Sequence, residues 1–392
     1  MTPFKYPLAT SSWDDAEQTA MQRVISSGMF TMGPLVLEFE KRFAEYIGSK
    51  YCVMVNSGSS ANLLMVAALF YTKNKALKLE AGDEVIVPAV SWSTTYYPLY
   101  QYGLKIRFVD IDIETLNYDL DQLEAAITNR TRAIMAVNLL GNPNDFSRIA
   151  SIIKNKNILL MEDNCESMGA EFNGKKAGSF GVMGTFSSFF SHHISTMEGG
   201  MIVTDDEEIY QILLSLRAHG WTRNLPKHNH VCGEKSDDPF KESFRFVLPG
   251  YNVRPLEMSG AIGIEQTKKL PSLIQERRKN GTLLQNALGN HPDIFIQKEI
   301  GNSSWFGFSL VIKPNSRLTR EQLLKKLNDQ GFECRPIVAG NFANNEVVKY
   351  FDSSVAGTLK NADHIDHNGL FIGNHHYPLV EAISTLKKTL QL

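Results

Sequence analysis

The feature that most constrains the fold is a repeated alternation of short apolar runs and helical segments, which begins at residue 51. Apolar residues are continuous within each run, as is typical of parallel strands that helices cover on both faces. The helical segments between the runs include residues 60–71 and 120–127. The runs themselves are residues 51–55, 84–88, 106–110, 133–137, 158–162 and 200–204. This rhythm predicts an α/β/α domain built around a mostly parallel, doubly wound sheet.

The segments on either side of this region have a different character. Residues 14–50 form two amphipathic helical stretches with an interruption at residues 28–33. Residues 224–243 are polar and rich in turn formers, so they are either an inert surface loop or a lid over an active site. A helical zone then extends over residues 255–288, and we expect Pro271 to interrupt it.

The C-terminal part of the chain predicts a second, smaller domain. Residues 305–313 and 332–337 have the composition of strands. Between them, Thr319 precedes a glutamine by three residues, as in the capping box that begins many helices. We therefore expect an N-terminal arm and a large α/β domain over residues 1–265, followed by a small α+β domain over residues 266–392.

Composition and charge argue against several classes of protein. The 40 basic and 42 acidic residues give a formal net charge of −2, which is unlike a nucleic-acid coat or a polybasic membrane anchor. No apolar run approaches the roughly 18 residues that cross a bilayer, and the N-terminus has no signal-peptide pattern. The cysteines at positions 52, 165, 232 and 334 are too scattered for a disulfide framework or a cluster site. We expect a cytoplasmic enzyme that uses no metal and binds neither nucleic acid nor a membrane.

The first candidate site is a turn of small residues between a predicted strand and a strongly helical run. It has the sequence Asn-Ser-Gly-Ser-Ser-Ala-Asn over residues 56–62. Small residues let the backbone approach an anion closely, and the free N–H groups of a helix start can hold a phosphate. The alternative is a plain strand-to-helix turn in which a serine caps the helix. Both interpretations remain open on this motif alone.

A second candidate lies at the carboxyl end of a predicted buried strand, where ligands bind in open α/β sheets. Glu162, Asp163 and Glu166 lie at this strand end. A carboxylate there can cap a helix, bind a metal or pair with a cationic ring nitrogen. Because no histidine clusters nearby in the sequence, the metal interpretation is weak. The cap and the ring-nitrogen partner both remain open.

The third candidate is a serine-rich stretch, residues 184–200, which ends in Glu-Gly-Gly and contains His192 and His193. On an extended segment, neighbouring side chains point to opposite sides, so the two imidazoles make a poor chelate for one metal. Two hydrogen-bonded structural histidines are the alternative to a reactive residue. The serine-rich setting and the Glu-Gly-Gly turn before a strand favour the reactive interpretation.

The order of these motifs resembles that of one known family. Matching stretches outside the three motifs are Gly28–Gly33, Val87–Trp92, Asn138–Gly141, Arg217–Gly220 and Gly250–Arg254. Over nearly its full length, the chain is similar to the nucleotide-sugar branch of the fold-type I pyridoxal-phosphate enzymes, the DegT/DnrJ/EryC1/StrS family. The resemblance implies an aspartate-aminotransferase-like α/β fold, with a large α/β/α domain and a smaller α+β C-terminal domain.

One position departs from the family pattern. The family's lysine, which forms a Schiff base with the cofactor, stands six residues before the Glu-Gly-Gly motif, and this chain has His192 there. An imidazole cannot form that bond. The resemblance therefore implies pyridoxal 5'-phosphate or pyridoxamine 5'-phosphate held noncovalently, with His192 as catalytic acid and base. This is the pattern of 3-dehydratases that act on nucleotide-linked 4-ketohexoses.

Two types of such dehydratase are relevant. One carries an iron–sulfur cluster on four cysteines, a grouping that this chain lacks. The resemblance implies the other type, which removes the C3 hydroxyl of GDP-4-keto-6-deoxy-D-mannose to give GDP-4-keto-3,6-dideoxy-D-mannose, an intermediate of colitose in the O-antigen of lipopolysaccharide. L-glutamate would regenerate the amine form of the cofactor, and ammonia would be released. The alternatives are a nucleotide-sugar aminotransferase of the same family and a cofactor-binding protein without activity.

The resemblance also implies a role for individual residues. Gly58, Ser59 and Ser187 would bind the cofactor phosphate. Trp92 would stack on the cofactor ring, although ordinary core packing is the alternative for a tryptophan. Asp163 would pair with the protonated ring nitrogen and keep the ring an electron sink.

The remaining implied roles concern the ring hydroxyl, the substrate and a second subunit. Glu166 would contact the ring hydroxyl, and Asn252 would reach the cofactor in the site of a neighbouring subunit. A homodimer with shared active sites is therefore expected. The residues implied to bind sugar substrate or glutamate are Gly28, Met29, Phe30, Thr31, His219, Arg223, Arg254 and Glu333.

Overall fold

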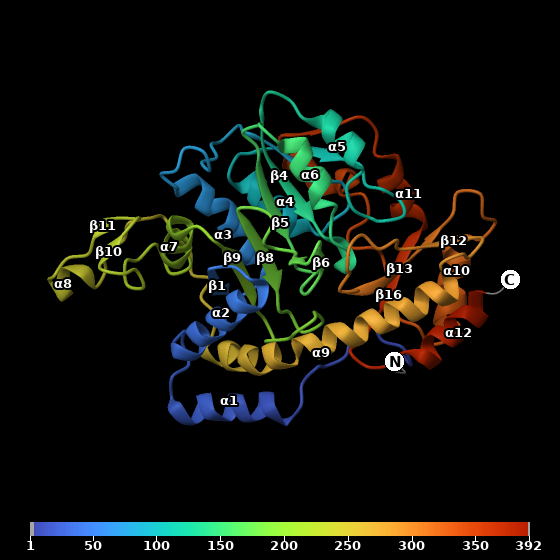
Figure 1. Ribbon diagram of the computed structural model, residues 1–392, viewed down its shortest axis with the longest axis horizontal. Helices are drawn as coiled ribbons and strands as arrows, with labels where there is room; N and C mark the ends of the chain where they lie inside the picture. The colour runs from blue at the N-terminus through green and yellow to red at the C-terminus, as the bar shows by residue number, and fades with distance from the viewer. Residues whose placement is uncertain (1–3, 391–392) are drawn as a thin grey trace.

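The computed structural model of the chain describes residues 4–390, and an eight-stranded sheet forms the centre of its larger part (Figure 1). Strands β8, β5, β4, β2, β3 and β15 pair in parallel, whereas β9 pairs antiparallel with both β8 and β1. The prediction of a mostly parallel α/β sheet is confirmed. In spatial order the strands are β1 (Tyr51–Val55), β9 (Gly200–Thr204), β8 (Met183–Ser187), β5 (Leu159–Asp163), β4 (Thr131–Val137), β2 (Glu84–Pro88), β3 (Lys105–Val109) and β15 (Ser353–Val355).

Helices cover both faces of the sheet because successive strand residues point to opposite sides. In β2, Val85 and Val87 belong to one apolar cluster, and Ile86 belongs to a second cluster on the other face. The first face packs against α3 (Gly58–Tyr71), α4 (Ser93–Gln101) and α7 (Glu207–Leu216). The opposite face packs against α5 (Leu120–Ala126), α6 (Phe146–Ile153), α2 (Pro34–Ile47) and α9 (Glu257–Leu288).

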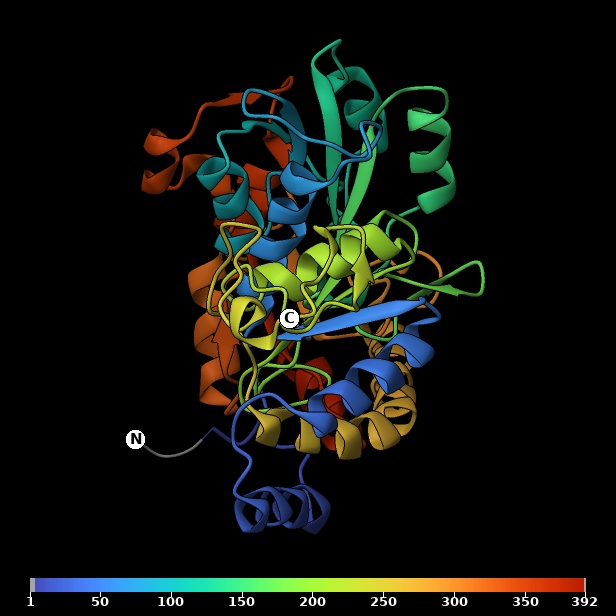
Figure 2. The same cartoon turned by 90° about the vertical axis from the view of Figure 1, so that its left-hand side faces the viewer.

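Helix α9 is the long helix at the base of the molecule, and α1 (Asp15–Ser27) lies beneath it (Figures 1 and 2). Helix α9 begins under the large sheet and ends in the small domain. Gly260 lets α2 cross closely, because a Cβ there would lie 2.6 Å from the backbone nitrogen of Val36. The expected interruption at Pro271 is wrong: α9 continues through this proline. Its neighbours Leu270 and Leu273 are buried in the core, and this packing offsets the roughly 3 kcal/mol cost of an internal proline.

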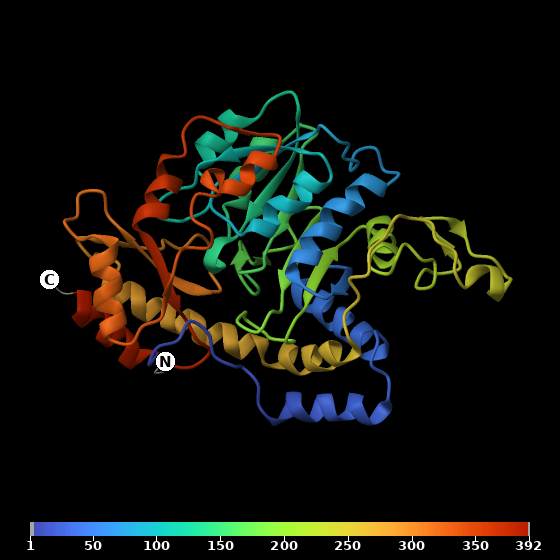
Figure 3. The same ribbon diagram turned by 180° about the vertical axis from the view of Figure 1, so that it is seen from behind.

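The small domain contains a four-stranded antiparallel sheet with its own apolar core. Both described ends of the chain lie near it (Figure 3). The expected helix after Thr319 is present, with both hydrogen bonds of the capping box. The elements of this part are β12 (Ile294–Ile296), β13 (Gly307–Ile312), β16 (Gly369–Gly373), β14 (Cys334–Arg335), α10 (Arg320–Asp329), α11 (Lys360–Asn368), α12 (Val380–Leu390) and the 3₁₀ turns Phe342–Asn344 and Glu346–Tyr350.

The domain boundary between residues 265 and 266 remains a prediction. Two elements connect the parts of the chain on either side of it. Helix α9 spans the boundary without a break. Strand β15, from the C-terminal third of the chain, pairs with β3 and so completes one edge of the large sheet. The two parts therefore share both a helix and a sheet.

The polar segment at residues 224–243 projects away from the large sheet (Figures 1 and 3). None of its residues lines the cavity described below, so within this chain it does not act as a lid. It contains β10 (His228–Asn229), β11 (Gly233–Glu234) and α8 (Pro239–Glu242). The remaining short elements are β6 (Glu171–Phe172), β7 (Lys175–Lys176) and the 3₁₀ turn Leu139–Gly141. Within residues 4–390, no helix combines the length and the apolar character that a membrane crossing requires.

Candidate active site

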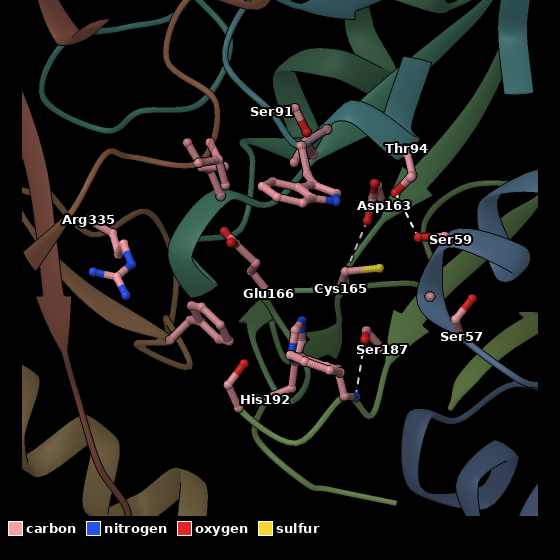
Figure 4. A pocket seen from close by; sticks show the side chains of 18 of the residues that line it. Ser57, Ser59, Ser91, Thr94, Asp163, Cys165, Glu166, Ser187, His192 and Arg335 are labelled. Atoms are coloured by element: carbon pink, nitrogen blue, oxygen red, sulfur yellow. Dashed lines mark hydrogen bonds between the residues drawn. The ribbon is translucent and has the colours of Figure 1, made fainter. Parts of the chain in front are cut away.

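The carboxyl ends of the central strands open onto a cavity of about 620 Å³ (Figure 4). Strand β5 ends there at Asp163 and β8 ends there at Ser187. The loop after β2 contributes Trp92, and the small domain contributes Arg335 on the opposite wall. This is the edge of a parallel sheet at which ligands bind in open α/β folds.

The start of α3 lines one end of the cavity. Ser57 caps the helix, because its side chain accepts a hydrogen bond from Ser60 N at 3.1 Å. The residues that follow, Gly58 and Ser59, line the cavity at the positive end of a 14-residue helix. A Cβ on Gly58 would lie 2.7 Å from Cβ of Ser187, so only glycine allows the two elements to approach this closely. Ser57 therefore caps the helix while Gly58 and Ser59 line the cavity, so the two interpretations of this turn do not exclude each other.

Asp163 is almost completely buried, and its carboxylate lines the cavity. One oxygen accepts hydrogen bonds from Asn62 Nδ2 and Thr95 Oγ1, both at 2.8 Å. The other accepts from Cys165 N at 3.1 Å. No α-helix begins after β5, because residues 164–169 form turns. The carboxylate thus satisfies one local N–H group but is not the N-cap of a helix.

Glu166 also lines the cavity and lies between Asp163 and Arg335 in Figure 4. Its Oε2 accepts a hydrogen bond from Leu140 N at 3.0 Å. Burial raises the pKa of this carboxyl to about 7, and the nearby Asp163 charge acts in the same direction. Glu166 can therefore hold or release a proton near neutral pH, as a partner of a ring hydroxyl must.

Trp92 contradicts the core-packing interpretation. Its side chain is 58% exposed, although it lines the cavity immediately before α4. An aromatic side chain that is more than half exposed is available to stack on a flat ligand. The predicted contact with a cofactor ring remains a prediction.

His192 lies in the cavity wall, on the loop between β8 and β9 (Figure 4). Its Nδ1 is buried without a hydrogen-bond partner among residues 4–390. The ring of Phe306 packs against the imidazole with centroids 5.1 Å apart. Burial lowers the pKa of His192 to about 4, and the positive charge of Arg277 contributes to this shift in the same direction. The imidazole is therefore neutral at physiological pH and able to accept a proton.

The side chain of His193 is buried in the protein interior. It is 1% exposed, and its Nε2 lies 3.1 Å from the carbonyl oxygen of Ser304. The expectation of an extended segment is wrong, because residues 190–194 form a turn and bends, and His192 N donates to Phe189 O at 2.9 Å. The two imidazoles nevertheless have different surroundings: that of His193 fits the structural alternative, whereas His192 lines the cavity.

The titration of His192 gives a direct test of this environment. We expect its imidazole in the cofactor-free protein to titrate near pH 4 and so to remain neutral from pH 5 to 8, because burial opposes the charged form. Two-dimensional NMR of the ring signals, assigned by their absence in a His192→Asn protein, measures this value. A midpoint near the unperturbed value of about 6.5 would contradict the prediction.

Several predicted substrate residues lie outside this cavity and gather around Trp221 instead. The ring of His219 is 4.8 Å from that indole, and Arg223 Cζ is 4.4 Å from it. Arg254 lies 5.8 Å from the same ring and donates to Asn252 Oδ1 at 3.0 Å. Residues 28–31 are a further surface segment away from the cavity lining. Within one chain these residues do not join Asp163 and His192.

In the small domain, Arg335 lines the cavity, and not Glu333, which was predicted to bind sugar substrate or glutamate. Glu333 does not line the cavity; its carboxylate accepts from Leu8 N at 3.1 Å and from Arg335 Nη2 at 2.8 Å. Arg335 itself lines the cavity, and it is the one lysine or arginine among the described lining residues. Sequence reasoning missed this arginine, although positions 333 and 335 share a face of the predicted strand.

The comparisons with known proteins decide the family. The sequence profile of the DegT/DnrJ/EryC1/StrS aminotransferase family matches residues 11–385. The chain belongs to this family. A Helicobacter pylori aminotransferase of pseudoaminic acid biosynthesis, with 23% identity and a TM-score of 0.83, has the same fold. The predicted family and aspartate-aminotransferase-like fold are therefore confirmed.

Much more similar relatives share one activity. The chain is 65% identical over 382 residues to the GDP-4-keto-6-deoxy-D-mannose 3-dehydratase of Yersinia pseudotuberculosis, covering 97% of each chain. It is 63% identical over 387 residues to that of Escherichia coli O55:H7, covering 98% of this chain and 99% of the relative. A solved E. coli enzyme with bound hydrated PLP has a TM-score of 0.97 at 62% identity, covering 99% of this chain and all of the other. Another structure, with the same score and coverage, holds a trapped PLP–glutamate geminal diamine.

The residues of the cavity fit pyridoxal phosphate. The N-terminus of α3 suits a phosphate, and a nearly buried carboxylate at Asp163 suits a protonated ring nitrogen. The unpartnered Nδ1 of His192 leaves an imidazole free in the wall. No lysine lies among the described residues of the cavity lining, which agrees with noncovalent binding.

Proposed function

We propose that the protein is a pyridoxal-phosphate-dependent 3-dehydratase of GDP-4-keto-6-deoxy-D-mannose. The enzyme removes the C3 hydroxyl to give GDP-4-keto-3,6-dideoxy-D-mannose, and glutamate regenerates the amine form of the cofactor with release of ammonia. The single observation that carries this proposal is His192 in the cavity wall where aminotransferases of the family have a lysine. Identities of 63% and 65% to dehydratases of this substrate support it.

The chain's own residues divide the work between binding and proton transfer. When bound, the cofactor supplies an electron sink for the carbon next to its nitrogen. The carboxylate of Asp163 would pair with the ring nitrogen, and the start of α3 would hold the phosphate. As a neutral base, His192 would accept the proton that this carbon loses, and as the conjugate acid it would give that proton to the C3 oxygen, which leaves as water. This histidine lacks an amine and therefore cannot bind the cofactor covalently.

Product analysis separates this function from the aminotransferase alternative. Purified protein is incubated with GDP-4-keto-6-deoxy-D-mannose, glutamate and pyridoxal phosphate, followed by mass spectrometry and an ammonia assay. A dehydratase yields a ketone that has lost the C3 oxygen, together with one ammonia per turnover. An aminated sugar without loss of oxygen would show an aminotransferase, and no reaction would show a protein without activity.

Replacing Arg335 should weaken the binding of an anionic reactant. The Arg335 side chain lines the cavity and donates to Glu333 Oε1 at 2.8 Å and to Cys334 O at 3.2 Å, so its other N–H groups are available for a carboxylate or a diphosphate. We expect Arg335→Leu to raise the KM of glutamate or of the GDP-sugar by about 10–100-fold, with a smaller effect on kcat. Steady-state kinetics with each substrate varied in turn measures this. Arg130→Leu, an exposed arginine outside the cavity, is the control; equal effects of both changes would contradict the assignment.

A homodimer with shared active sites belongs to the same proposal. Met29, Phe30 and Leu256 are large apolar side chains, each about half exposed, and Phe30 O accepts from the amide of Glu257 next to Leu256. Contiguous exposed apolar side chains mark interaction surfaces, and symmetric dimers are the commonest soluble assemblies. A second chain would also give Asn252 and its neighbours access to a cofactor. Sedimentation of an active monomer would contradict this assembly.

The location of the enzyme follows from its substrates. GDP-sugars and glutamate are charged and do not cross a bilayer unaided, so we place the reaction in the cytoplasm. Fractionation of cells that produce the protein, with the activity assayed in each fraction, tests this.

A further inference from the structure

Two buried side chains behind the cavity wall hold the carboxylate of Asp163. Asn62 is 1% exposed and Thr95 is fully buried, and neither lines the cavity. Both donate to Oδ2 of Asp163 at 2.8 Å. Because water does not reach either residue, no solvent molecule can replace these donors if one is lost.

The surroundings of Asn62 determine which way its amide points. Its Nδ2 lies 3.3 Å from the carbonyl oxygen of Thr94, which can only accept a hydrogen bond. Its Oδ1 lies 2.6 Å from the hydroxyl of Thr185, which donates to it. The amide therefore presents an N–H group, and not its oxygen, to Asp163.

The hydroxyl of Thr95 also acts as a hydrogen-bond donor to Asp163. It has a single proton and lies 2.8 Å from both Asp163 Oδ2 and Ser91 Oγ. A carboxylate only accepts, so Thr95 donates to Asp163 and accepts from Ser91. Both hydroxyl groups are buried. A chain of donated hydrogen bonds therefore ends on the carboxylate.

Within residues 4–390, these contacts leave one acceptor site of the Asp163 carboxylate without a partner. A carboxylate offers about four acceptor sites, and Asn62, Thr95 and the amide of Cys165 occupy three of them. All three partners are donors, which is the pattern that a negatively charged carboxylate satisfies. The remaining acceptor site belongs to an oxygen whose residue lines the cavity.

We infer that Asn62 and Thr95 are positioning residues that keep Asp163 charged and aimed at the ring nitrogen of the cofactor. The inference rests on the proposed function, because the ring nitrogen is the partner that the free acceptor site requires. Neither residue lines the cavity, so neither would contact the cofactor. Their effect passes through Asp163, so it concerns protonation of the ring nitrogen and, through it, the strength of the electron sink.

The test uses pyridoxal phosphate labelled with ¹⁵N in the ring, bound to full-length protein. Thr95→Val removes the hydroxyl at nearly constant shape, and Thr95→Ser keeps it as the matched control. We expect Thr95→Val to move the ¹⁵N signal toward the unprotonated value and to weaken cofactor affinity about 2–10-fold. It should lower kcat more than it raises the KM of the sugar. Thr95→Ser should restore the signal and the affinity.

A second variant keeps the inference testable if Thr95→Val does not fold. Asn62→Leu removes the other donor and should move the ¹⁵N signal in the same direction, with folding checked by circular dichroism of the cofactor-free protein. An unchanged ¹⁵N signal and affinity in the folded variants would overturn the inference and leave the proposed function intact. Wild-type protein that binds pyridoxal phosphate but does not dehydrate the sugar would overturn the proposed function instead.

Discussion

Replacing His192 with asparagine is expected to lower the rate of C3 dehydration by about 10²–10⁴-fold, the usual contribution of a positioned acid–base group. Asparagine is similar in size to histidine and polar, but it cannot accept or return a proton. Cofactor and GDP-sugar affinity should change little, because the contacts at α3 and Asp163 are retained. Rates come from chromatography of the product, and affinities come from fluorescence titration.

His193→Asn is the matched control for this prediction. It changes the adjacent imidazole, which is buried against Ser304 O and does not line the cavity. We expect a loss of stability in that variant, with dehydration per folded molecule largely retained. If His192→Asn dehydrates the sugar at nearly the wild-type rate, the base lies elsewhere.

A chemical experiment tests noncovalent binding in the unmodified protein. Borohydride reduces imines between a lysine and pyridoxal phosphate to stable bonds. Because His192 stands in the lysine position, we expect no added mass on the wild-type chain after reduction and dialysis. A covalent adduct on any residue, detected by intact-mass spectrometry, would contradict the noncovalent site.

Replacing Asp163 with asparagine should have the second large effect. The amide keeps the shape but removes the negative charge that faces the ring nitrogen, so the electron sink weakens more than binding does. We expect kcat to fall by about 10²–10³-fold, as when an electrostatic group aimed at developing charge is removed. Some cofactor should remain bound, which the visible spectrum and a fluorescence titration would show.

The local-cap alternative makes a different prediction for the same variant. If Asp163 serves only as the acceptor for the Cys165 amide and the buried side chains of Asn62 and Thr95, activity should survive and the free energy of unfolding should fall by about 0.5–2 kcal/mol. Chemical denaturation of the cofactor-free protein measures that loss. A stable, inactive Asp163→Asn protein would therefore favour the role in catalysis.

The sequence by itself indicated the sheet and two positions that the structure places in the wall of the cavity. Continuous apolar runs predict strands covered on both faces, and the structure places Val85 and Ile86 of β2 in opposite cores. Asp163 was predictable because it ends such a run, and the ends of parallel strands meet at one edge. His192 was selected because the resemblance places the family's lysine six residues before the Glu-Gly-Gly turn, and this chain has a histidine there.

Only the tertiary structure decided which distant residues join these positions. Arg335 lines the cavity in place of Glu333, and Asn62 and Thr95 meet Asp163 from two different helices. Pro271 lies within a continuous helix because buried neighbours on both sides hold it there. In each case the deciding contact joins residues far apart in the chain or depends on core packing. Local patterns report which elements form, and their side-chain contacts arise only when those elements pack.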